Sequence, residues 1–454
     1  MKTLLLSLAL AGAVTAQAQN PVVQTWFTTD PAPMVHGDRL YLYTGHDEDG
    51  ADFFWMQEWR VYSTADMVNW TDHGSPLAIE DFSWGDDRAW APQCIERNGK
   101  FYFYVPLHSS LSGGMAIGVA VGNSPTGPFR DVLGKPLYDD GKWDNIDPTV
   151  MIDDDGQAWL FWGNPVIKYC QLNEDMISIK GEVMQVNQTE EGFGAPSPEL
   201  REKGKKYKDM YTEGPWINKY KGKYYLLYAA GGVPEHIAYS WATKPTGPWH
   251  YGGTIMPQGG TDSFTNHTGI VDDFKGHSYF FYHTGWLPGG GGFGRSVAVE
   301  EYKRNADGSF PTITPTREGV KPIGTLNPYQ RVEFETMAFS RGVKTENASK
   351  GVYVSQTHNG DYIKLQAVDF GSKGPSRISL SAASALRGGT IELHADSIAG
   401  SLIATVRVDG TGGWEKWRTF SAETQPITGT HDLYFVFKGR KGPQLFSLDW
   451  WKVK

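Results

Sequence analysis

Five segments of the chain share one pattern, in which a turn glycine precedes a run of alternating or continuous aromatic and aliphatic residues. The segments read HGDRLYLYTG, NGKFYFYVP, DGQAWLFWG, KGKYYLLYA and KGHSYFFYH, and their turn glycines are Gly37, Gly99, Gly156, Gly222 and Gly276. A glycine turn that leads into such a run is typical of a hairpin that opens a strand. The pattern therefore predicts five hairpins in a chain built mainly from strands.

The spacing of these hairpins predicts a repeat architecture. Successive turn glycines lie 62, 57, 66 and 54 residues apart, and a smaller motif, SPTGPF from Ser124 and KPTGPW from Lys244, recurs at the same place in alternate repeats. A repeat of this length made of short strands is typical of propeller blades with four strands each. We expect an all-β fold, with a five-bladed β-propeller over residues 19–325.

Counting back from the turn glycines reveals a second pattern, in polar residues. Nine positions before the four later glycines stand Trp90, Asp147, Glu213 and His267, and Asp30 stands seven positions before the first. Blades are related by rotation about the propeller axis, so these residues are predicted to converge at one mouth of the central channel. Three carboxylates in such a ring cost free energy unless they serve a function, because like charges repel.

The chemistry that best suits converging carboxylates is glycoside hydrolysis. One carboxyl must protonate the leaving oxygen, and another must activate water or attack the sugar. A third carboxylate beside the acid can hold its pKa up by repulsion. Proline follows Asp30 and Asp147 directly and follows Glu213 after one glycine, which suits the start of a strand. No serine nucleophile motif of the G-x-S-x-G type occurs with ordered partners.

Composition supports this interpretation. The 454 residues carry a formal net charge of −9, so no basic field is available for nucleic acid or anionic lipid. There are 54 glycines, 17 tryptophans and 22 tyrosines, which favours strands, tight turns and a sugar-stacking surface. The two cysteines, Cys94 and Cys170, exclude a disulfide scaffold, and the sequence leaves open whether they pair.

The N-terminus is typical of an export signal. Lys2 precedes an apolar run of about eleven residues from Leu4 to Val14, which is too short to span a bilayer. Ala16-Gln17-Ala18 fits an A-x-A cleavage site, so residues 1–18 are predicted to be removed. We expect a secreted or periplasmic protein with no membrane partner.

The segments TTDPAPMVHGDRLYLYTGHDED, RAWAPQCIERNGKFYFY, NIDPTVMIDDDGQAWLFWG, TEGPWINKYKGKYYLLYA and NHTGIVDDFKGHSYFFYH together resemble glycoside hydrolase family 43. The resemblance implies a five-bladed propeller and inversion at the anomeric carbon. It assigns Asp30 as general base, Glu213 as general acid and Asp147 as the residue that tunes the pKa of the acid.

The same resemblance implies several substrate contacts. Trp90 would form a wall of the subsite for the cleaved sugar, Arg295 in GGFGRSVAVEEY would contact substrate, and His267 would face a Ca²⁺ ion or a water cluster in the channel. No cofactor is implied for catalysis.

The first repeat bears on specificity. The stretch from His46 through DFFWMQEWRVYSTADMVNW resembles family members that remove α-L-arabinofuranose side chains from arabinoxylan, with Phe53 at the pocket rim. Relatives cleave β-xylosides or arabinan instead, so both stay open as alternatives, as does a non-catalytic glycan-binding protein. In each case the expected partner is a plant cell-wall polysaccharide, arabinoxylan or arabinan, or its oligosaccharides.

After a proline-dotted link, residues 331–454 change character to short alternating strands, which predicts a β-sandwich of jelly-roll type. VEFETMA, HNGDYIKLQAVDF, TGTHDLYFVFKG and LFSLDWWKVK resemble carbohydrate-binding module family 6. By that resemblance, Glu333, Glu335 and Asp449 would help to hold a structural Ca²⁺.

The resemblance also implies that Tyr353 and Trp414 are sugar-stacking platforms. One position departs from the family, because Ser447 stands where an asparagine usually bonds sugar hydroxyls. The module is therefore expected either to bind glycan or to stabilise the propeller.

Overall fold

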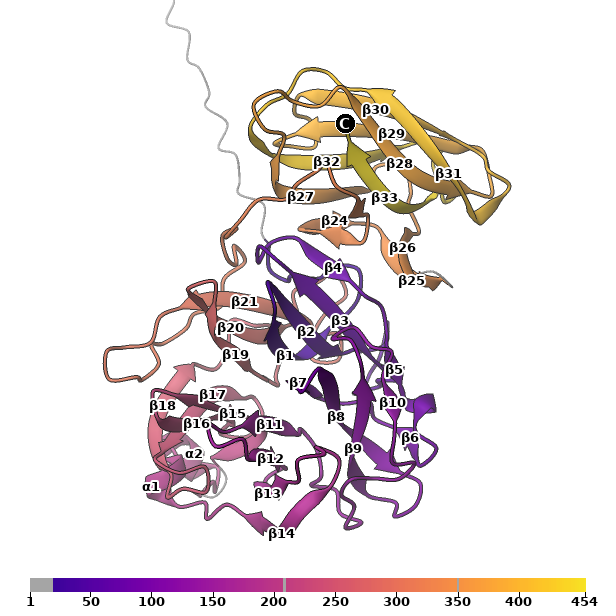
Figure 1. Ribbon diagram of the computed structural model, residues 1–454. Helices are drawn as coiled ribbons and strands as arrows, with labels where there is room; N and C mark the ends of the chain where they lie inside the picture. The colour runs from indigo at the N-terminus through magenta and orange to yellow at the C-terminus, as the bar shows by residue number, and fades with distance from the viewer. Residues whose placement is uncertain (1–18, 207–209, 349–350) are drawn as a thin grey trace, which may run out of the picture.

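The computed structural model describes residues 19–206, 210–348 and 351–454, and these ranges are mainly β-strand (Figure 1). The predicted signal peptide, residues 1–18, lies outside the described residues. The helices in the described part are short: η1 (Ile79–Asp81), α1 (Glu190–Phe193) and α2 (Pro198–Glu202). None of them is long and apolar enough to cross a membrane.

Five antiparallel sheets follow one another along the described part of residues 19–302. The first holds β1 (Thr29–His36), β2 (Arg39–Gly45), β3 (Glu58–Thr64), β4 (Trp70–Asp72) and β5 (Leu77–Ala78). The second holds β6 (Gly85–Asp87), β7 (Gln93–Arg97), β8 (Lys100–Ser109), β9 (Met115–Gly122) and β10 (Arg130–Asp131). The third holds β11 (Thr149–Ile152), β12 (Ala158–Trp162), β13 (Lys168–Leu172) and β14 (Ile179–Gln185). The fourth holds β15 (Tyr211–Tyr220), β16 (Lys223–Ala230), β17 (His236–Ala242) and β18 (His250–Met256), and the fifth holds β19 (Gly269–Phe274), β20 (His277–Thr284) and β21 (Ser296–Tyr302).

The five predicted hairpins are confirmed. The pairs β1–β2, β7–β8, β11–β12, β15–β16 and β19–β20 are each antiparallel and joined by a tight turn. All five turn glycines have positive φ, between 62° and 86°, a region that disfavours side chains with a Cβ. The glycines are thus required by the backbone of the turns.

The first strands of these hairpins surround a common centre. β1 contacts β7 and β19, β7 contacts β11, β11 contacts β15, and β15 contacts β19, which closes a ring. Figure 1 shows these strands gathered at the middle of the lower part of the molecule. The arrangement is consistent with a β-propeller, in which the start of each innermost strand faces the axis.

The C-terminal part consists of two sheets that enclose their own core. One sheet has the order β25-β26-β33-β28-β31, with β22 beside β33, and the other has the order β24-β27-β32-β29-β30. Between them pack large apolar side chains such as Phe334, Phe435 and Trp451. This part is consistent with the predicted β-sandwich. The bounds are β22 (Val332–Glu333), β24 (Phe339–Arg341), β25 (Lys344–Ala348), β26 (Gly351–Ser355), β27 (Tyr362–Asp369), β28 (Arg377–Ser384), β29 (Gly388–Ala395), β30 (Leu402–Asp409), β31 (Gly413–Glu423), β32 (Thr430–Lys438) and β33 (Ser447–Val453).

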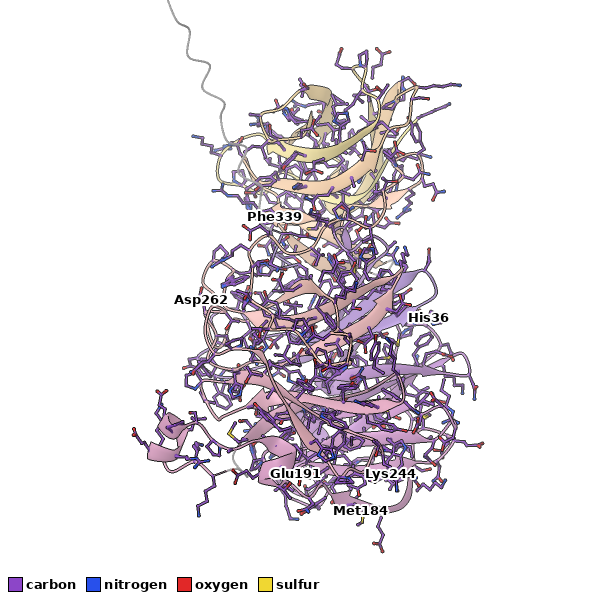
Figure 2. All side chains as sticks on the ribbon, turned by 90° about the vertical axis from the view of Figure 1, so that its left-hand side faces the viewer. His36, Met184, Glu191, Lys244, Asp262 and Phe339 are labelled. Atoms are coloured by element: carbon purple, nitrogen blue, oxygen red, sulfur yellow. The ribbon has the colours of Figure 1, made fainter. Side chains whose placement is uncertain are left out.

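The sandwich is joined to the first sheet of the propeller part by more than the connecting chain. The short strand β23 (Thr336–Met337) pairs with β4, so a strand from the C-terminal part completes an N-terminal sheet. Figure 2 shows the two parts stacked, with Phe339 at their junction.

The two cysteines, Cys94 and Cys170, are both buried and free, which answers the question that the sequence left open.

A buried charge network lies at this junction. Asp72 accepts hydrogen bonds from Thr345 Oγ1 of the sandwich (2.5 Å) and from the Gly74 backbone N–H (2.7 Å), and its carboxylate pairs with Arg60 (3.2 Å). Asp72 is only 3% exposed. Arg60 also pairs with Glu58 (2.7 Å), so the loss of Asp72 would chiefly remove a buried acceptor shared by both parts, and this carboxylate is expected to matter for their stability.

We therefore expect Asp72→Ala to lower the free energy of unfolding by about 1–3 kcal/mol, because Thr345 Oγ1 and the Gly74 N–H would lose a buried acceptor while Arg60 keeps Glu58. Denaturant unfolding followed by tryptophan fluorescence measures the change. Asp38→Ala, in the exposed β1–β2 turn, is the matched control and is expected to stay within about 0.5 kcal/mol of the wild type. Equal stability of the Asp72 and Asp38 variants would contradict the assigned role of the network.

Candidate active site

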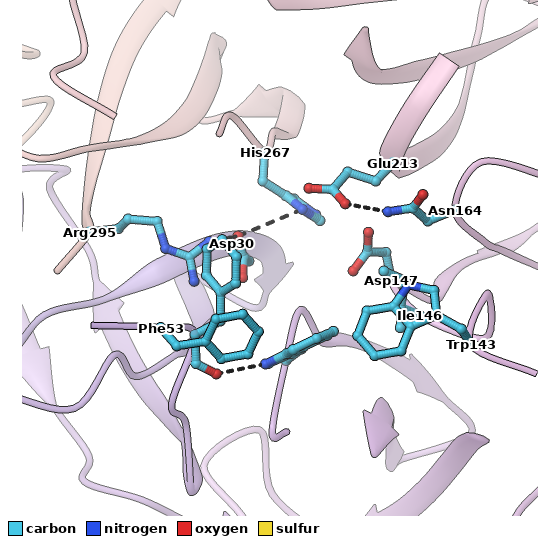
Figure 3. Close-up of a pocket in the computed structure, with 11 residues that line it drawn as sticks. Asp30, Phe53, Trp143, Ile146, Asp147, Asn164, Glu213, His267 and Arg295 are labelled. Atoms are coloured by element: carbon cyan, nitrogen blue, oxygen red, sulfur yellow. Dashed lines mark hydrogen bonds and ion pairs between the residues drawn. The ribbon is translucent and has the colours of Figure 1, made fainter. Parts of the chain in front are cut away.

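A pocket of about 220 Å³ opens where the first strands of the five sheets begin. Its lining residues are Asp30, Phe53, Phe54, Trp90, Trp143, Ile146, Asp147, Asn164, Glu213, His267 and Arg295 (Figure 3). The structure thus brings together the three predicted catalytic carboxylates and all four residues predicted to contact substrate in the propeller part. Figure 3 shows Arg295 and Asp30 on one side of the pocket, with Glu213, Asn164 and Asp147 on the other.

Local backbone conformation directs two of the carboxylates into the pocket. Asp30 and Asp147 have φ of 50° and 59°, the left-handed region, although each directly precedes a proline. A positive φ is unfavourable for a residue with a side chain, and a proline at the next position makes it more so. Each of the two residues therefore costs about 1–3 kcal/mol. Such strain persists only where the surrounding structure enforces it, and it concentrates at functional sites.

Asp30 is held as an anion. Burial by itself would raise its pKa, but the charge of Arg295 (Nη1 to Oδ1, 3.3 Å) and the imidazole of His283 (Nδ1 to Oδ1, 3.3 Å) outweigh burial and hold the pKa well below its usual range. The Thr29 hydroxyl also donates to Asp30 Oδ1 (3.0 Å). A carboxylate that stays ionised can accept a proton from water, as a general base must.

Arg295 is fixed in turn by Asp47. The guanidinium Nε and Nη2 donate to the two oxygens of the Asp47 carboxylate (2.9 and 2.8 Å), and the Arg295 backbone N–H donates to Asp47 Oδ2 (2.8 Å). Asp47 is fully buried, and Arg295 nearly so. This bidentate geometry sets both the position and the plane of the guanidinium. Asp47 therefore determines where the positive charge beside Asp30 lies.

The opposite side of the pocket favours a protonated carboxyl. Burial and the charge of Asp30 raise the pKa of Glu213 to about 7. Arg295 and the Asn164 amide, which donates to Glu213 Oε2 (2.6 Å), lower this pKa but do not outweigh burial. Burial and the charge of Glu213 likewise raise the pKa of Asp147, whose Oδ2 accepts the Gly214 backbone N–H (2.9 Å). Near neutral pH the pocket therefore combines a proton donor with an ionised base.

His267 lies between the two sides. Burial lowers its pKa to about 4, so its ring is neutral near pH 7. A Cβ on residue 214 would stand 2.9 Å from His267 Nδ1, and Gly214 has φ of 61°. Only glycine therefore lets the chain that follows Glu213 pass this close to the imidazole ring.

The rim of the pocket is aromatic. The Trp90 indole donates to the Phe54 carbonyl (3.0 Å) and packs edge-on against Trp143, whose ring is half exposed. Phe53 is partly exposed beside Phe54, and the Arg295 guanidinium lies 4.8 Å from the centre of the Phe54 ring. Flat apolar faces around a few convergent polar groups are typical of a small-molecule pocket.

Several residues of the site escaped sequence reasoning. Asp47 lies within the His46–Asp49 stretch, His283 lies near the end of β20 in the fifth repeat segment, away from a strand start, and Asn164 lies in a connecting segment. A further carboxyl, Glu235, is buried nearby, and its Oε2 accepts the backbone N–H of Asn266 (2.7 Å). Its pKa is raised by burial and by the charge of Glu213. The offset from a turn glycine locates only residues at strand starts.

The predicted stacking platforms of the sandwich differ from each other. Tyr353 is 6% exposed, packs edge-on against Trp417, and donates its hydroxyl to Glu346 Oε2 (2.7 Å). The prediction that Tyr353 offers an open ring to sugar does not match this burial, because neighbouring side chains cover it. Trp414, on β31, is partly exposed.

The predicted calcium residues of the sandwich surround a cation of the chain itself. Arg331 bonds both oxygens of Glu333 (2.7 and 2.8 Å) and Asp449 Oδ1 (3.1 Å), while Glu335 is buried with Oε2 unpartnered. No group of three or more histidine, cysteine or acidic side chains in the described ranges has an arrangement that fits a metal ion. As arranged, these three residues do not fit Ca²⁺, because Arg331 already neutralises two of them.

Comparisons with known proteins agree with this site. Residues 18–310 match Glycosyl hydrolases family 43, and residues 333–454 match Carbohydrate binding module (family 6). An arabinoxylan arabinofuranohydrolase of Bacillus subtilis is 31% identical over 95% of this chain and 92% of its own length.

Solved structures also show similarity to family 43. A family 43 arabinoxylan arabinofuranohydrolase from Bacillus subtilis, in complex with cellotetraose, has a TM-score of 0.79 at 29% identity and covers 96% of this chain and 98% of its own. A family 43 β-xylosidase/α-arabinofuranosidase from a compost metagenome, in a calcium-free form with xylotriose, has a TM-score of 0.57 at 30% identity, over 66% of this chain and 97% of its own.

A mainly β-strand scaffold with an ionised and a protonated carboxyl in one sugar-sized pocket defines a glycoside hydrolase. The sequence match over most of the chain then makes the assignment specific. The protein belongs to glycoside hydrolase family 43 and carries a C-terminal family 6 carbohydrate-binding module.

The raised pKa of Glu213 predicts the pH dependence of catalysis. Because the acid must carry its proton, we expect kcat/KM to fall as pH rises through about 7, the pKa of Glu213. The low pKa of Asp30 predicts no matching loss until strongly acidic pH. A pH profile of kcat/KM with an aryl glycoside measures the loss of activity at both high and low pH. An activity that rises through neutral pH would contradict this protonation pattern.

The Asp47–Arg295 pair predicts a mutational effect. Asp47→Asn is expected to lower kcat/KM roughly 10- to 100-fold, because it removes a charge-assisted hydrogen bond worth about 1.5–3 kcal/mol. Asp49→Asn is the matched control two residues away, since its side chain is 55% exposed and pairs with Lys344. Steady-state kinetics and melting curves separate catalysis from folding. Equal losses in the two variants would contradict the positioning role.

Proposed function

We propose that this protein is an exported, inverting exo-glycosidase that removes α-L-arabinofuranose side chains from arabinoxylan. The observation that carries the proposal is the geometry of one pocket, in which Asp30 contacts Arg295 on one side and Glu213 accepts the Asn164 amide on the other. The close similarity to arabinoxylan arabinofuranohydrolases over nearly the whole chain supports the choice of sugar.

In this mechanism Asp30 removes a proton from water while the water oxygen attacks the anomeric carbon. The bond from that carbon to the leaving oxygen breaks as Glu213 transfers its proton to the oxygen. Asp147 lies beside Glu213, and repulsion between their charges favours keeping a proton on this side of the pocket. Arg295 keeps Asp30 ionised, so that the two roles are not exchanged.

We further propose that the five sheets of the N-terminal part are five propeller blades. The closed ring of contacts among β1, β7, β11, β15 and β19 supports this, as does the start of each of these strands at the pocket. The export signal in residues 1–18 is part of the same proposal, and mass spectrometry of the secreted protein tests it through a mature N-terminus at Gln19.

A structural Ca²⁺ beside His267 is a further part of the proposal. A neutral imidazole can accept a hydrogen bond from water around such an ion, and one solved relative is described in a calcium-free form. In the sandwich, an ion would first have to displace Arg331. Melting temperature with and without a chelator tests the channel ion, and an unchanged value would count against it.

The second candidate is a β-xylosidase with the same machinery, since a relative with both activities covers the propeller part. Paired assays on aryl α-L-arabinofuranoside and aryl β-D-xyloside distinguish the two. We expect the arabinofuranoside to be the better substrate by kcat/KM. NMR analysis of the first product released from arabinoxylan identifies the sugar, its linkage and the anomeric outcome.

The acid and base roles predict different responses to the leaving group. Asp30→Ala and Glu213→Ala are each expected to lower turnover of arabinoxylan roughly 10²–10⁴-fold while the fold survives. An aryl glycoside with a good leaving group needs little protonation, so it is expected to restore much of the activity of Glu213→Ala but not of Asp30→Ala. Equal behaviour of both variants on both substrates would remove these role assignments.

A further inference from the structure

A second hollow, which we call the α2 hollow, lies between α2 and the strands β17 and β18. Its volume is about 360 Å³, and it shares no lining residue with the catalytic pocket. Its lining includes Ser197, Lys203, Met210, His236, Tyr251 and Gln258. The catalytic mechanism uses none of them.

The α2 hollow lies close to the catalytic acid. Met210 is three residues before Glu213, which corresponds to about 10 Å along an extended chain. Its carbonyl accepts the backbone N–H of Gly231 (2.8 Å), and the Gly232 N–H donates to Thr212 Oγ1 (2.8 Å). These bonds join the wall of the hollow to the strand that carries Glu213.

The α2 hollow and Glu213 lie at the same end of the fourth sheet, because Met210, Gly231 and His236 adjoin the paired residues next to Glu213. Glu213 protonates the oxygen of the departing group, so that group must lie on the Glu213 side, away from Arg295 (Figure 3). The next sugar rings of a polysaccharide beyond the cleaved bond therefore extend past Glu213.

The lining of the hollow suits a neutral polyol. Its acidic and basic side chains, Glu199 and Lys203, lie 3.9 Å apart and balance each other, so neither an anion nor a cation is favoured. Tyr251 supplies an aromatic ring that packs against the backbone at Gly194, where a Cβ would lie 3.1 Å from it. Aromatic rings with nearby hydrogen-bonding groups are well suited to sugar rings, which combine apolar C–H faces with hydroxyls.

His236 adds a hydrogen-bonding group that is ready for a ligand. Burial lowers the pKa of His236, so the ring is neutral, and it makes no hydrogen bond within the described ranges. Its ring packs against the backbone at Gly231, where a Cβ would lie 3.0 Å away. A neutral imidazole offers one donor and one acceptor nitrogen to sugar hydroxyls.

We propose that the α2 hollow is a subsite that binds a sugar residue of the polysaccharide backbone on the leaving-group side of the cleaved bond. The inference rests on the proposed function, since it takes the backbone of arabinoxylan as the ligand. It assigns Tyr251 as the stacking surface and His236 and Gln258 as hydroxyl partners.

Two substrates of different length test the subsite. Tyr251→Ala and Gln258→Ala are expected to lower kcat/KM on arabinoxylo-oligosaccharides about tenfold, mainly through KM, because truncating a contact residue commonly costs more than about 1 kcal/mol. Both variants are expected to keep the wild-type kcat/KM on an aryl α-L-arabinofuranoside, which cannot reach the hollow. Gln258 is exposed, so its variant is expected to fold.

Tyr329→Ala, which removes a ring 40% exposed on the connecting segment, is the matched control and is expected to change neither value. Losses no larger on the oligosaccharide than on the aryl substrate would overturn the subsite.

A binding experiment separates this inference from the proposed function. Because the C-terminal module is also a candidate glycan binder, calorimetric titration with linear xylotetraose is analysed with two sites, and one of them is expected to weaken about tenfold in Tyr251→Ala. If the wild type cleaved no arabinofuranoside, the proposed function would fail, and the titration would still decide on the hollow. Equal affinity in both proteins, or no binding to the wild type, would overturn the inference.

Discussion

The position of one guanidinium group governs the chemistry of this pocket. Arg295 is clamped by the buried Asp47 carboxylate and reaches Asp30, so a single positive charge is fixed on one side of a cluster of acids. Its charge acts strongly here because Arg295, Asp30 and Asp47 are all buried. It keeps Asp30 ionised, while Glu213 and Asp147 lie on the opposite side and have raised pKa values. The division between base and acid follows from this asymmetry.

The scaffold supplies the strain and repulsion that the site requires. The ring of innermost strands forces Asp30 and Asp147 into left-handed backbone conformations and crowds like charges together. These costs are offset by the packed sheets behind them, whose cores are rich in large aromatic side chains. The sandwich adds a strand to the first sheet and a hydrogen bond to the buried Asp72. The module is therefore part of the structural support of the N-terminal part.

Repetition explains which features the sequence could predict. Turn glycines mark each hairpin, and a constant offset from them finds the strand starts, so Asp147, Glu213 and His267 follow from one rule. Asp30 needed a shorter offset, and Arg295 came only from family resemblance. The rule finds only strand starts, which is why it missed His283, near the end of β20, and Asn164 and Glu235, in connecting segments. Family resemblance did not predict burial at Tyr353. This aromatic residue stands at an expected binding position, but its neighbours cover it.

The central claim is that Asp30 and Glu213 carry opposite charge states at neutral pH. Carbon-13 NMR of protein labelled at the aspartate and glutamate carboxyls, with Asp30→Asn and Glu213→Gln to assign the signals, measures both groups directly. The account predicts that the Glu213 signal titrates with a pKa near 7, while the Asp30 signal stays that of a carboxylate down to the lowest pH at which the fold survives. A Glu213 signal that titrates in the ordinary range of a free glutamate, or an Asp30 signal that titrates above it, would contradict the account.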